Sequence, residues 1–357
     1  MPGLREALVA ESSKRPTRSA ELEPSWVVDI GDFPTDLAWS PGGERLAVAS
    51  AAGPIVVLGS EGDEQLRHRG HELGSLAVDW SPQGERLASG GQDGRARVWV
   101  PGDSSPQAEL RGGAAWVELL AWSEDGGHLA TGSGKFLKVW DASDWSEVGS
   151  FDHPNTISGL AWRGESGRLV TSSYGGIQFW ELGQPTARRT FRWKGSLICM
   201  RVSPNGRWII CGSQDCSVHI WKSASGQDLE MSGYPLKVKQ LGWSDDSRYL
   251  ATGGGADVCI WDFSGRGPAG TRPEVRQGHV DAIADVAFQP GSHLLASLGR
   301  DGSLCFWNGA KGKGKKALGT GGRPSSGSKL AWSPDGTSVA AAFESGEVVA
   351  WKAPSVS

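Results

Sequence analysis

The sequence lacks several features that would indicate a membrane-spanning, secreted or disulfide-linked protein. No apolar run approaches the ~20 residues that a membrane-spanning helix needs. The N-terminus has no apolar stretch of the kind that forms a secretory signal. The five cysteines are an odd number and no two have CxxC spacing, which favours reduced thiols. We therefore expect a soluble, cytoplasmic protein in a reducing compartment.

A strong excess of charge of one sign is also missing. The chain has 36 Lys and Arg against 40 Asp and Glu, a net charge of −4. This balance argues against general coating of nucleic acid or adhesion to a membrane. Residues 1–24 mix acids, bases, Ser and Pro without sustained periodicity, so we expect a disordered tail there.

Tryptophan and glycine, by contrast, are abundant: 18 Trp and 52 Gly stand against three Tyr and three Met. Such a skew suggests one structural position that is filled many times. One residue before a turn recurs at intervals of 40 to 45 residues. These pre-turn residues are Trp39, Trp80, Trp122, Trp162, Val202, Trp243, Phe288 and Trp332. A closing residue follows each by 18 or 19 positions: Leu58, Trp99, Trp140, Trp180, Trp221, Trp261, Trp307 and Trp351. The chain thus contains eight copies of one pattern, numbered here from first to eighth.

Within each copy the letters predict short antiparallel strands. "SPQG" at 81–84 places Pro second in a four-residue turn, where its fixed φ is favoured, and Gly at the exit. "RLASGG" at 86–91 is a strand of small and apolar residues, and an Asp-Gly turn leads from it into "ARVW" at 96–99. Each copy therefore supplies three strands and a linker long enough for a fourth.

The pattern resembles the WD40 repeat family of β-propellers. The marks of the family here are Gly70-His71, Gly278-His279 and the Trp-Asp pairs at 140–141 and 261–262, together with the period near 42. The resemblance covers residues 25–357 and implies an all-β fold: a single closed propeller with eight four-stranded blades. Seven blades is the alternative, if the divergent first or last copy fails to form one.

The last copy has no room after Trp351 for a fourth strand. "SWVVDIG" at 25–31 stands where the other linkers carry their fourth strand. We expect this segment to complete the last blade, because closure of the ring removes an exposed sheet edge.

Two copies contain a Ser, a His and an Asp, residue types that also make up hydrolase triads. A Trp accompanies them both times at matching spacing, and the resemblance assigns such sets to structural tetrads that pin loops through buried hydrogen bonds. The tetrads are His71, Ser89, Asp93 and Trp99 in the second copy and His279, Ser297, Asp301 and Trp307 in the seventh. We expect no catalytic residue and no cofactor, and we interpret His153 as a remnant of the same position in the fourth copy.

The five cysteines fall in the fifth to seventh copies, close in sequence to His219. They are Cys199, Cys211, Cys216, Cys259 and Cys305. Cys259, Cys305 and His219 stand two residues before closing tryptophans of successive blades, which is too far apart for zinc bonds of ~2.0 to 2.3 Å. Only Cys211 and His219 could touch, so we predict small apolar packing of the thiols and no metal site.

The remaining charged stretch is the Gly-rich linker at 309–328, with Lys311, Lys313, Lys315 and Lys316. It lacks a phosphate-loop signature and interleaved aromatic residues, which favours a solvated loop. An adaptor that binds RNA or another anionic partner through these lysines remains the alternative function. An enzyme or metal-binding protein that uses the central funnel is a further alternative, although no convergent set of carboxylates, His or Cys remains outside the tetrads.

A rim of short loops on a rigid frame suits recognition of another protein. We predict a non-enzymatic scaffold, a monomeric ring within a larger complex, that binds one or more proteins through an acidic or peptide-like segment and binds neither membrane nor nucleic acid. The resemblance places the contact positions on the top face. They are Phe33, Gln92, Trp116, Glu118, Tyr174, Gln214, Lys237, Lys239, Arg300 and Glu344.

Overall fold

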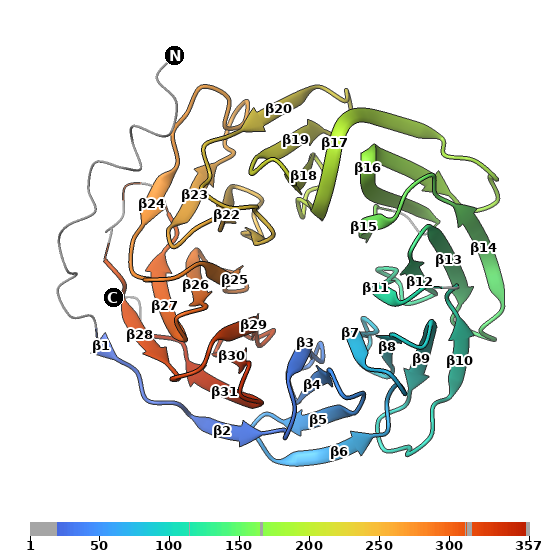
Figure 1. The fold of residues 1–357 in the computed structure, drawn as a ribbon, viewed down its shortest axis with the longest axis horizontal. Helices are drawn as coiled ribbons and strands as arrows, with labels where there is room; N and C mark the ends of the chain where they lie inside the picture. Colours follow the sequence, from blue (N-terminus) through green and yellow to red (C-terminus); the bar gives the residue numbers. More distant parts are fainter. Residues whose placement is uncertain (1–19, 114, 165–166, 311, 313–315, 355–357) are drawn as a thin grey trace.

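The fold is a ring of β-sheets around a central channel (Figure 1). The structure, a computed structural model, describes residues 20–113, 115–164, 167–310, 312 and 316–354. All regular elements among these residues are strands, 31 in number. The predicted all-β propeller is confirmed.

Local chemistry forms the strands and turns as the repeat pattern predicts. In the second copy the backbone N–H of Gly84 donates to the carbonyl of Ser81 at 2.8 Å, which closes the "SPQG" turn. Gly84 has φ +74°, a left-handed conformation that glycine adopts without the penalty of a Cβ. The Ser81 hydroxyl oxygen accepts a hydrogen bond from the backbone N–H of Arg86 at 3.1 Å and fixes the start of the next strand.

Hydrogen-bonded order runs outward from the channel in each sheet (Figure 1). The first copy forms β3 (Pro34–Trp39), β4 (Arg45–Ser50), β5 (Ile55–Gly59) and β6 (Glu64–His68). The second forms β7 (Ser75–Trp80), β8 (Leu87–Gly91), β9 (Arg95–Trp99) and β10 (Ala108–Arg111). The third forms β11 (Val117–Trp122), β12 (His128–Ser133), β13 (Phe136–Asp141) and β14 (Glu147–Asp152). The fourth and fifth copies form β15 (Ile157–Trp162), β16 (Arg168–Glu181), β17 (Arg189–Val202), β18 (Trp208–Ser213), β19 (Val218–Lys222) and β20 (Asp228–Met231). The sixth copy forms β21 (Leu241–Trp243), β22 (Tyr249–Thr252), β23 (Val258–Asp262) and β24 (Glu274–Arg276). The seventh forms β25 (Ile283–Phe288), β26 (Leu294–Gly299), β27 (Ser303–Asn308) and β28 (Gly319–Gly322), to which β1 (Ala20–Glu21) is added. The eighth forms β29 (Gly327–Trp332), β30 (Ser338–Phe343) and β31 (Glu347–Lys352), and β2 (Trp26–Asp29) completes it.

The predicted count of eight separate four-stranded sheets is wrong, because the described strands form seven sheets. The first and last copies, for which the sequence left the loss of a blade open, each form a sheet of their own. The fourth and fifth copies instead merge into one six-stranded sheet. The physical cause is the pairing of Tyr174 with Ser196, which keeps β17 extended from the outer part of the fourth copy into the inner part of the fifth.

Each sheet is apolar on both faces, so the core consists of layers between neighbouring sheets. Between the first two copies, Ile55 and Val57 pack against Trp80, Leu87 and Trp99. The opposite face of the first copy, with Val48 and Leu58 among its residues, packs against the eighth copy. No sheet within the described ranges closes on itself; the inner strands instead contact one another in cyclic order around the channel.

The pre-turn tryptophans fasten neighbouring copies to each other near the channel. In five copies the indole Nε1–H donates to a carbonyl of the preceding copy, one residue before that copy's own pre-turn position. These bonds run from Trp39 to Ala331 (3.1 Å), Trp80 to Ala38 (3.0 Å), Trp122 to Asp79 (3.2 Å), Trp162 to Ala121 (2.8 Å) and Trp332 to Ala287 (3.0 Å). Val202 and Phe288 have no N–H to offer, and the indole nitrogen of Trp243 is buried without a partner.

Three aspartates add a second set of links between inner strands. Their Oδ2 atoms accept backbone N–H groups of the next copy, from Val78 to Asp36 (3.2 Å), from Trp122 to Asp79 (3.4 Å) and from Leu330 to Asp285 (3.1 Å). Such N–H groups lie at the channel edge of an inner strand, where no further strand pairs with them. The carboxylates therefore satisfy donors that the sheet itself leaves open.

The N-terminal segment completes the eighth copy as predicted. Trp26 to Asp29 of β2 pair antiparallel with Ala350 to Glu347 of β31. The expectation of a disordered tail over 1–24 is wrong for its last residues, because Ala20 and Glu21 pair in parallel with Gly319 and Thr320 of β28. Residues 1–19 lie outside the described residues.

Removal of residues 1–31 should expose the outer edge of β31, which β2 covers in the full chain. An unpaired edge strand presents free N–H and C=O groups to other molecules, so the truncated protein should aggregate and melt at a lower temperature. Size-exclusion chromatography and thermal melting check this. A truncated protein that stays monomeric and melts like the full chain would show that β2 is not needed for closure.

Asp79→Asn should stabilise the protein, and by clearly more at pH 8 than at pH 5. Desolvation raises the pKa of Asp79 from 3.8 to about 7, although the backbone N–H of Trp122 donates to the carboxyl and opposes the rise. The folded chain therefore holds this proton more tightly than the unfolded chain, and stability falls as the pH rises from about 4 to about 7. The amide keeps an acceptor oxygen and carries no charge, so it should gain about 1 to 3 kcal/mol at pH 8. Urea unfolding at both pH values measures the effect, and an equal gain at pH 5 would exclude titration as its cause.

Candidate functional site

The tetrad of the second copy is one continuous chain of hydrogen bonds. The Trp99 indole N–H donates to Ser89 Oγ at 2.9 Å, and Ser89 Oγ lies 2.9 Å from His71 Nε2. His71 Nδ1 lies 2.9 Å from Asp93 Oδ1. The Asp93 carboxylate only accepts and favours a proton on Nδ1, with the serine hydroxyl donating to Nε2, whereas the guanidinium Nη1 of Arg97, which only donates, lies 2.7 Å from the same Nδ1. Burial lowers the pKa of His71, which favours the neutral imidazole that this chain of donors requires.

Arg97 extends the tetrad of the second copy by a buried cation that the sequence analysis did not single out. It is 8% exposed; its Nη1 donates to Asp93 Oδ2 at 2.7 Å and its Nε to Glu109 Oε1 at 3.3 Å. Desolvation raises the pKa of Asp93, but the hydrogen bonds from Arg97 and His71 outweigh it and hold the pKa below its ordinary value. The available signal was an arginine two positions before Trp99, between the apolar residues Ala96 and Val98.

The tetrad of the seventh copy contains an inserted hydroxyl. His279 Nε2 lies 2.7 Å from Ser297 Oγ, to which the Trp307 indole donates at 2.8 Å. The other imidazole nitrogen is 3.5 Å from Asp301 Oδ1 but only 2.7 Å from Ser303 Oγ. Ser303 in turn donates to Asp301 at 2.6 Å, so it bridges a contact that is direct in the second copy.

Two other copies have shortened versions of the same chain. In the fourth copy His153 Nε2 lies 3.1 Å from Thr171 Oγ1, which also accepts the Trp180 indole at 2.9 Å. His153 thus occupies the position that the sequence assigns to it. In the sixth copy a tyrosine stands in for the histidine, and the Tyr234 hydroxyl lies 2.9 Å from Thr252 Oγ1.

The tetrads are built to hold loops in place. His71 and Ser89 are 2% and 0% exposed, and each of their polar atoms is already bonded within the protein. A nucleophile and its base must instead reach a reacting atom in an accessible site. The arrangement therefore joins the connection before each inner strand to the hairpin between the second and third strands.

The cysteines lie in strands or turns and are all free. Cys211 and His219 are cross-strand partners, as predicted. Burial raises the pKa of Cys259 and of Cys305 to about 12 and that of Cys211 well above its usual value, so these thiols stay protonated. Over the described residues, no three His, Cys, Asp or Glu side chains are grouped to hold a metal ion.

The top face is defined by two segments of each copy: the connection just before the inner strand and the hairpin between the second and third strands. In five copies a backbone hydrogen bond joins the two segments, from the N–H of the residue twelve after the pre-turn position to the carbonyl six before it. The bonds run from Ala51 to Phe33 (2.9 Å), Gln92 to Gly74 (2.9 Å), Gln214 to Ser196 (2.9 Å), Arg300 to Ala282 (2.8 Å) and Glu344 to Ser326 (2.8 Å). This bond holds the two kinds of predicted contact position side by side.

All ten predicted contact residues are accessible, and every copy contributes at least one. Phe33, Trp116 and Tyr174 are 38%, 51% and 55% exposed. Gln92 is half-buried; the exposed charged and polar members are Glu118, Gln214, Lys237, Lys239, Arg300 and Glu344. Whether these residues bind a partner stays a prediction.

Lys237 and Lys239 lie before the inner strand of the sixth copy, which begins only at Leu241. Val238 between them is nevertheless fully buried, so the two lysines do project away from the core. In the lysine-rich linker, Lys311, Lys313 and Lys315 lie outside the described residues.

Exposed large apolar side chains gather on the top face. Of the ten found among the described residues, seven belong to its connections or hairpins: Phe33, Leu73, Trp116, Phe136, Tyr174, Leu236 and Val280. The other three are Val27, Val148 and Leu318. The same face has a hollow of about 1000 Å³ between the fifth and sixth copies, whose lining includes Asp215, Tyr234 and Asp257. Leu73, Leu236 and Val280 were missed from the sequence; the available signal was an apolar residue seven or eight positions before the pre-turn residue.

Asp93→Ala should lower the free energy of unfolding by about 1 to 3 kcal/mol, because it leaves His71 and Arg97 without their shared acceptor. Asp301→Ala should cost a similar amount through Ser303 and the backbone N–H of Val280, which donates to Oδ2 at 2.7 Å. Since the pKa of each carboxyl is lowered in the fold, the loss should fade as the pH drops below the ordinary Asp value near 4.

The matched control is Arg97→Cys, which gives the second copy the residue that the seventh has at this place, Cys305. Combined with Asp93→Ala it should cost less than the sum of the two single changes, since no buried cation is left unpaired. Urea unfolding measures all variants. If Asp93→Ala leaves the unfolding free energy unchanged at pH 7, the tetrad does not pin the fold.

Comparison with known proteins supports the same architecture. A WD40 family model described as "WD domain, G-beta repeat" matches just over half of the chain, at residues 62–100, 104–141, 186–222, 229–262 and 271–308. The crystal structure of the computationally designed Ika8 protein superposes with a TM-score of 0.75 at 20% identity, covering 94% of this chain and 98% of that one. This second likeness concerns the fold alone.

Several curated proteins are similar over long stretches. "Protein FIZZY-RELATED 3" of Arabidopsis thaliana is 27% identical over 253 residues, 68% of this chain and 51% of that protein. "Anaphase-promoting complex subunit cdc20" of Dictyostelium discoideum is 21% identical over 83% of this chain and 62% of its own length. "Serine-threonine kinase receptor-associated protein" of Rattus norvegicus is 23% identical over 78% and 80%. The chain spans about half the length or less of the FIZZY-RELATED proteins it matches. On the repeat matches, the chain belongs to the WD40 repeat family.

Proposed function

We propose that this protein is a non-enzymatic scaffold that binds partner proteins on its top face during the assembly of a complex. The observation that carries the proposal is the gathering of exposed apolar side chains on that face, seven of the ten among the described residues. Large apolar side chains exposed on the same face as charged residues such as Lys237, Lys239 and Arg300 are a feature of protein-interaction sites. Trp116 and Tyr174 are residue types that dominate interface energetics.

The similar proteins support the same class of function. One of them is named as a subunit of the anaphase-promoting complex, and another as a protein associated with a kinase receptor. Both names describe proteins that act in company with other proteins. For this chain we propose a monomeric ring that acts in the cytoplasm, with its free cysteines reduced. The partner segment presents carboxylates to Lys237 and Lys239, which are exposed on the top face.

The residue types of a hydrolase triad that the sequence contains are used in the hydrogen bonds of the tetrads. The His, Ser and Asp side chains of the tetrads are bonded to one another, and the described residues contain no His, Cys and carboxylate group suited to a metal. No helix long and apolar enough to cross a bilayer occurs in the described part of the chain. A scaffold needs none of these features, since its rigid frame positions loops for recognition.

Trp116→Ala combined with Lys237→Glu and Lys239→Glu should abolish capture of the main partner while the melting curve stays nearly unchanged. Trp116 is 51% exposed and both lysines are exposed, so the changes remove contacts without opening the core. An interface tryptophan commonly contributes at least about 2 kcal/mol of binding. Affinity capture from native lysate, followed by mass spectrometry, compares the variant with wild type.

The control carries the same kinds of change away from the top face: Val148→Ala on an outer strand, with Arg207→Glu and Arg266→Glu in turns at the other end of the strands. It should capture the wild-type set of proteins. Equal capture by wild type and the top-face variant would place the binding surface elsewhere. Loss of the same partners from both variants would indicate a general effect of charge.

A further inference from the structure

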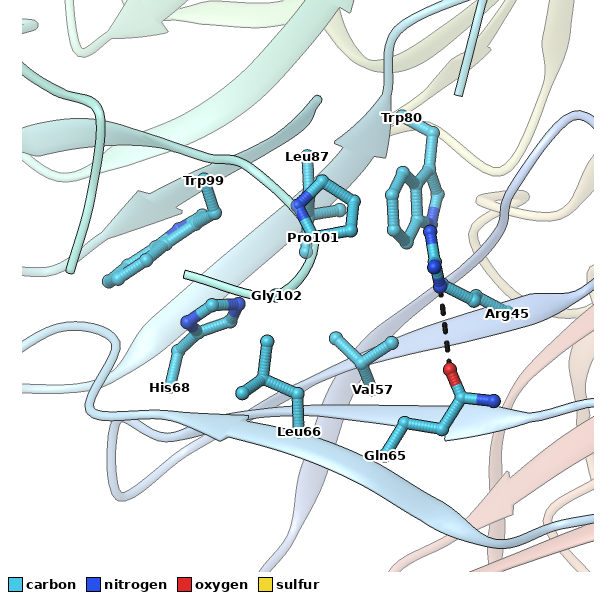
Figure 2. Close-up of a pocket in the computed structure, with 10 residues that line it drawn as sticks. All are labelled: Arg45, Val57, Gln65, Leu66, His68, Trp80, Leu87, Trp99, Pro101 and Gly102. Carbon is cyan, nitrogen blue, oxygen red and sulfur yellow. Dashed lines mark hydrogen bonds between the residues drawn. The ribbon is translucent and has the colours of Figure 1, made fainter. Parts of the chain in front are cut away.

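A small hollow lies between the first and second copies, at the end of the strands opposite to the top face. Its volume is about 220 Å³. Figure 2 shows Leu66 and Val57 pointing into it from the first copy, with Trp80, Trp99 and Pro101 of the second copy across from them. The complete lining is Arg45, Val57, Gln65, Leu66, His68, Trp80, Leu87, Trp99, Pro101 and Gly102. The hollow therefore has mainly apolar walls with one cation at its edge.

The corresponding place between the fifth and sixth copies is filled from within the chain. There the ring of Phe263 packs at 5.3 Å from Trp208 and at 4.7 Å from Trp243, measured between ring centroids. Phe263 follows its closing tryptophan by two residues, as Pro101 follows Trp99. Phe263 is 5% exposed and belongs to a buried apolar cluster.

Three residues around Phe263 correspond in position to residues that line the hollow. Trp208 stands six residues after its pre-turn position, as Arg45 does, and Trp243 is a pre-turn residue like Trp80. Leu229 pairs with the residue before a closing position, as Leu66 does. Between the third and fourth copies, Leu182 fills the equivalent place and lies against Gly149. The first and second copies thus keep the walls but lack the side chain that fills them.

Two polar groups around the hollow have unmet bonding capacity. His68 is 1% exposed and its Nδ1 has no hydrogen-bond partner, although its ring lies 4.3 Å from that of Trp99. Arg45 donates through Nε to Gln65 Oε1 at 3.4 Å, and no carboxylate of the described residues forms an ion pair with it. A buried polar atom without a partner is costly, so an occupant that supplies a donor or acceptor gains from it.

We propose that this hollow binds one phenylalanine-like side chain of a partner protein, adjacent in the partner's sequence to an aspartate or glutamate. The aromatic ring takes the place that Phe263 takes in its own junction, against Trp80 and Leu66. The neighbouring carboxylate pairs with Arg45, whose guanidinium can accept it in two hydrogen bonds. A polar group of the docking segment satisfies His68 Nδ1. The site is separate from the top face, so it does not depend on the proposed function.

The test uses a short synthetic probe, acetyl-Asp-(4-fluoro-Phe)-Gly-amide, observed by fluorine NMR with the full chain. A matched probe carries Asn in place of Asp. Three variants accompany wild type: Pro101→Phe, which supplies the missing side chain from within; Arg45→Gln, which removes the cation; and Arg207→Gln, an exposed arginine in the turn of the fifth copy, as control.

Wild type and Arg207→Gln should bind the Asp probe in the millimolar range, a value typical of one anchored side chain. Pro101→Phe should weaken binding at least about tenfold and raise the melting temperature, because its ring fills the hollow. Arg45→Gln should bind both probes equally, whereas wild type prefers Asp by about threefold or more. The imidazole nitrogen signals of His68 should shift on binding to wild type.

Absence of binding to wild type, or equal affinity for wild type and folded Pro101→Phe, would overturn the proposal. If Pro101→Phe fails to fold, Leu66→Trp fills the hollow from the opposite wall and must give the same loss. A wild-type dimer that Pro101→Phe dissolves would also overturn it, because the occupant would then be a second copy of the chain. Equal affinity of wild type for both probes would contradict the proposed pairing of a partner carboxylate with Arg45.

Discussion

Every sheet of this protein is apolar on both faces, and neither face can be left to water. Burial is worth roughly 25 cal/mol per Å² of apolar surface, so each sheet requires a neighbour on either side. A row of such sheets would leave two bare faces at its ends, and only a ring leaves none. The pairing of β2, from the N-terminal part of the chain, with β31, from its C-terminal part, completes the outer edge of the sheet of the eighth copy. Copies as different as the first, with Leu58 at its closing position, and the second, with Trp99, obey the same requirement.

Polar interactions between neighbouring copies add to the apolar packing of the ring, and they are unevenly distributed among the junctions. Indole hydrogen bonds link the seventh copy to the eighth, the eighth to the first, and each copy from the first to the fourth to the next. The three junctions between the fourth and seventh copies lack such a bond, because Val202 and Phe288 have no indole and the indole nitrogen of Trp243 has no partner. The inner strand of the sixth copy is also short, at three residues. The hollow of about 1000 Å³ lies at one of these less fastened junctions. We therefore expect this sector of the top face to be the least rigid.

The sequence predicted what repeats and failed where single copies depart from the repeat. Period, turns and the role of residues 25–31 follow from local chemistry that is the same in each copy, such as the Pro and Gly of "SPQG". The merger of the fourth and fifth copies depends on one pairing, Tyr174 with Ser196, that no periodic pattern contains. The parts that Arg97 and Ser303 play in the tetrads were not predicted, because they depend on which side chain lies opposite each residue in the folded blade. The top-face positions were found by analogy of position, and their exposure could be predicted while their partners could not.

Function in such a ring is best sought in the differences between copies, because the shared features are already explained by packing. His71, His279 and Tyr234 occupy corresponding positions in three copies, and each lies against a hydroxyl. The residue type at this position changes the hydrogen bonds that hold the loop, while the strands of the blade stay the same. The same reasoning applies to the other end of the strands. Phe263 and Leu182 show that a large side chain is compatible with the fold at that place, so Pro101 is not forced by the architecture. The open hollow between the first and second copies is therefore a property of those copies and not a requirement of the fold, which is the reason to look for an occupant there.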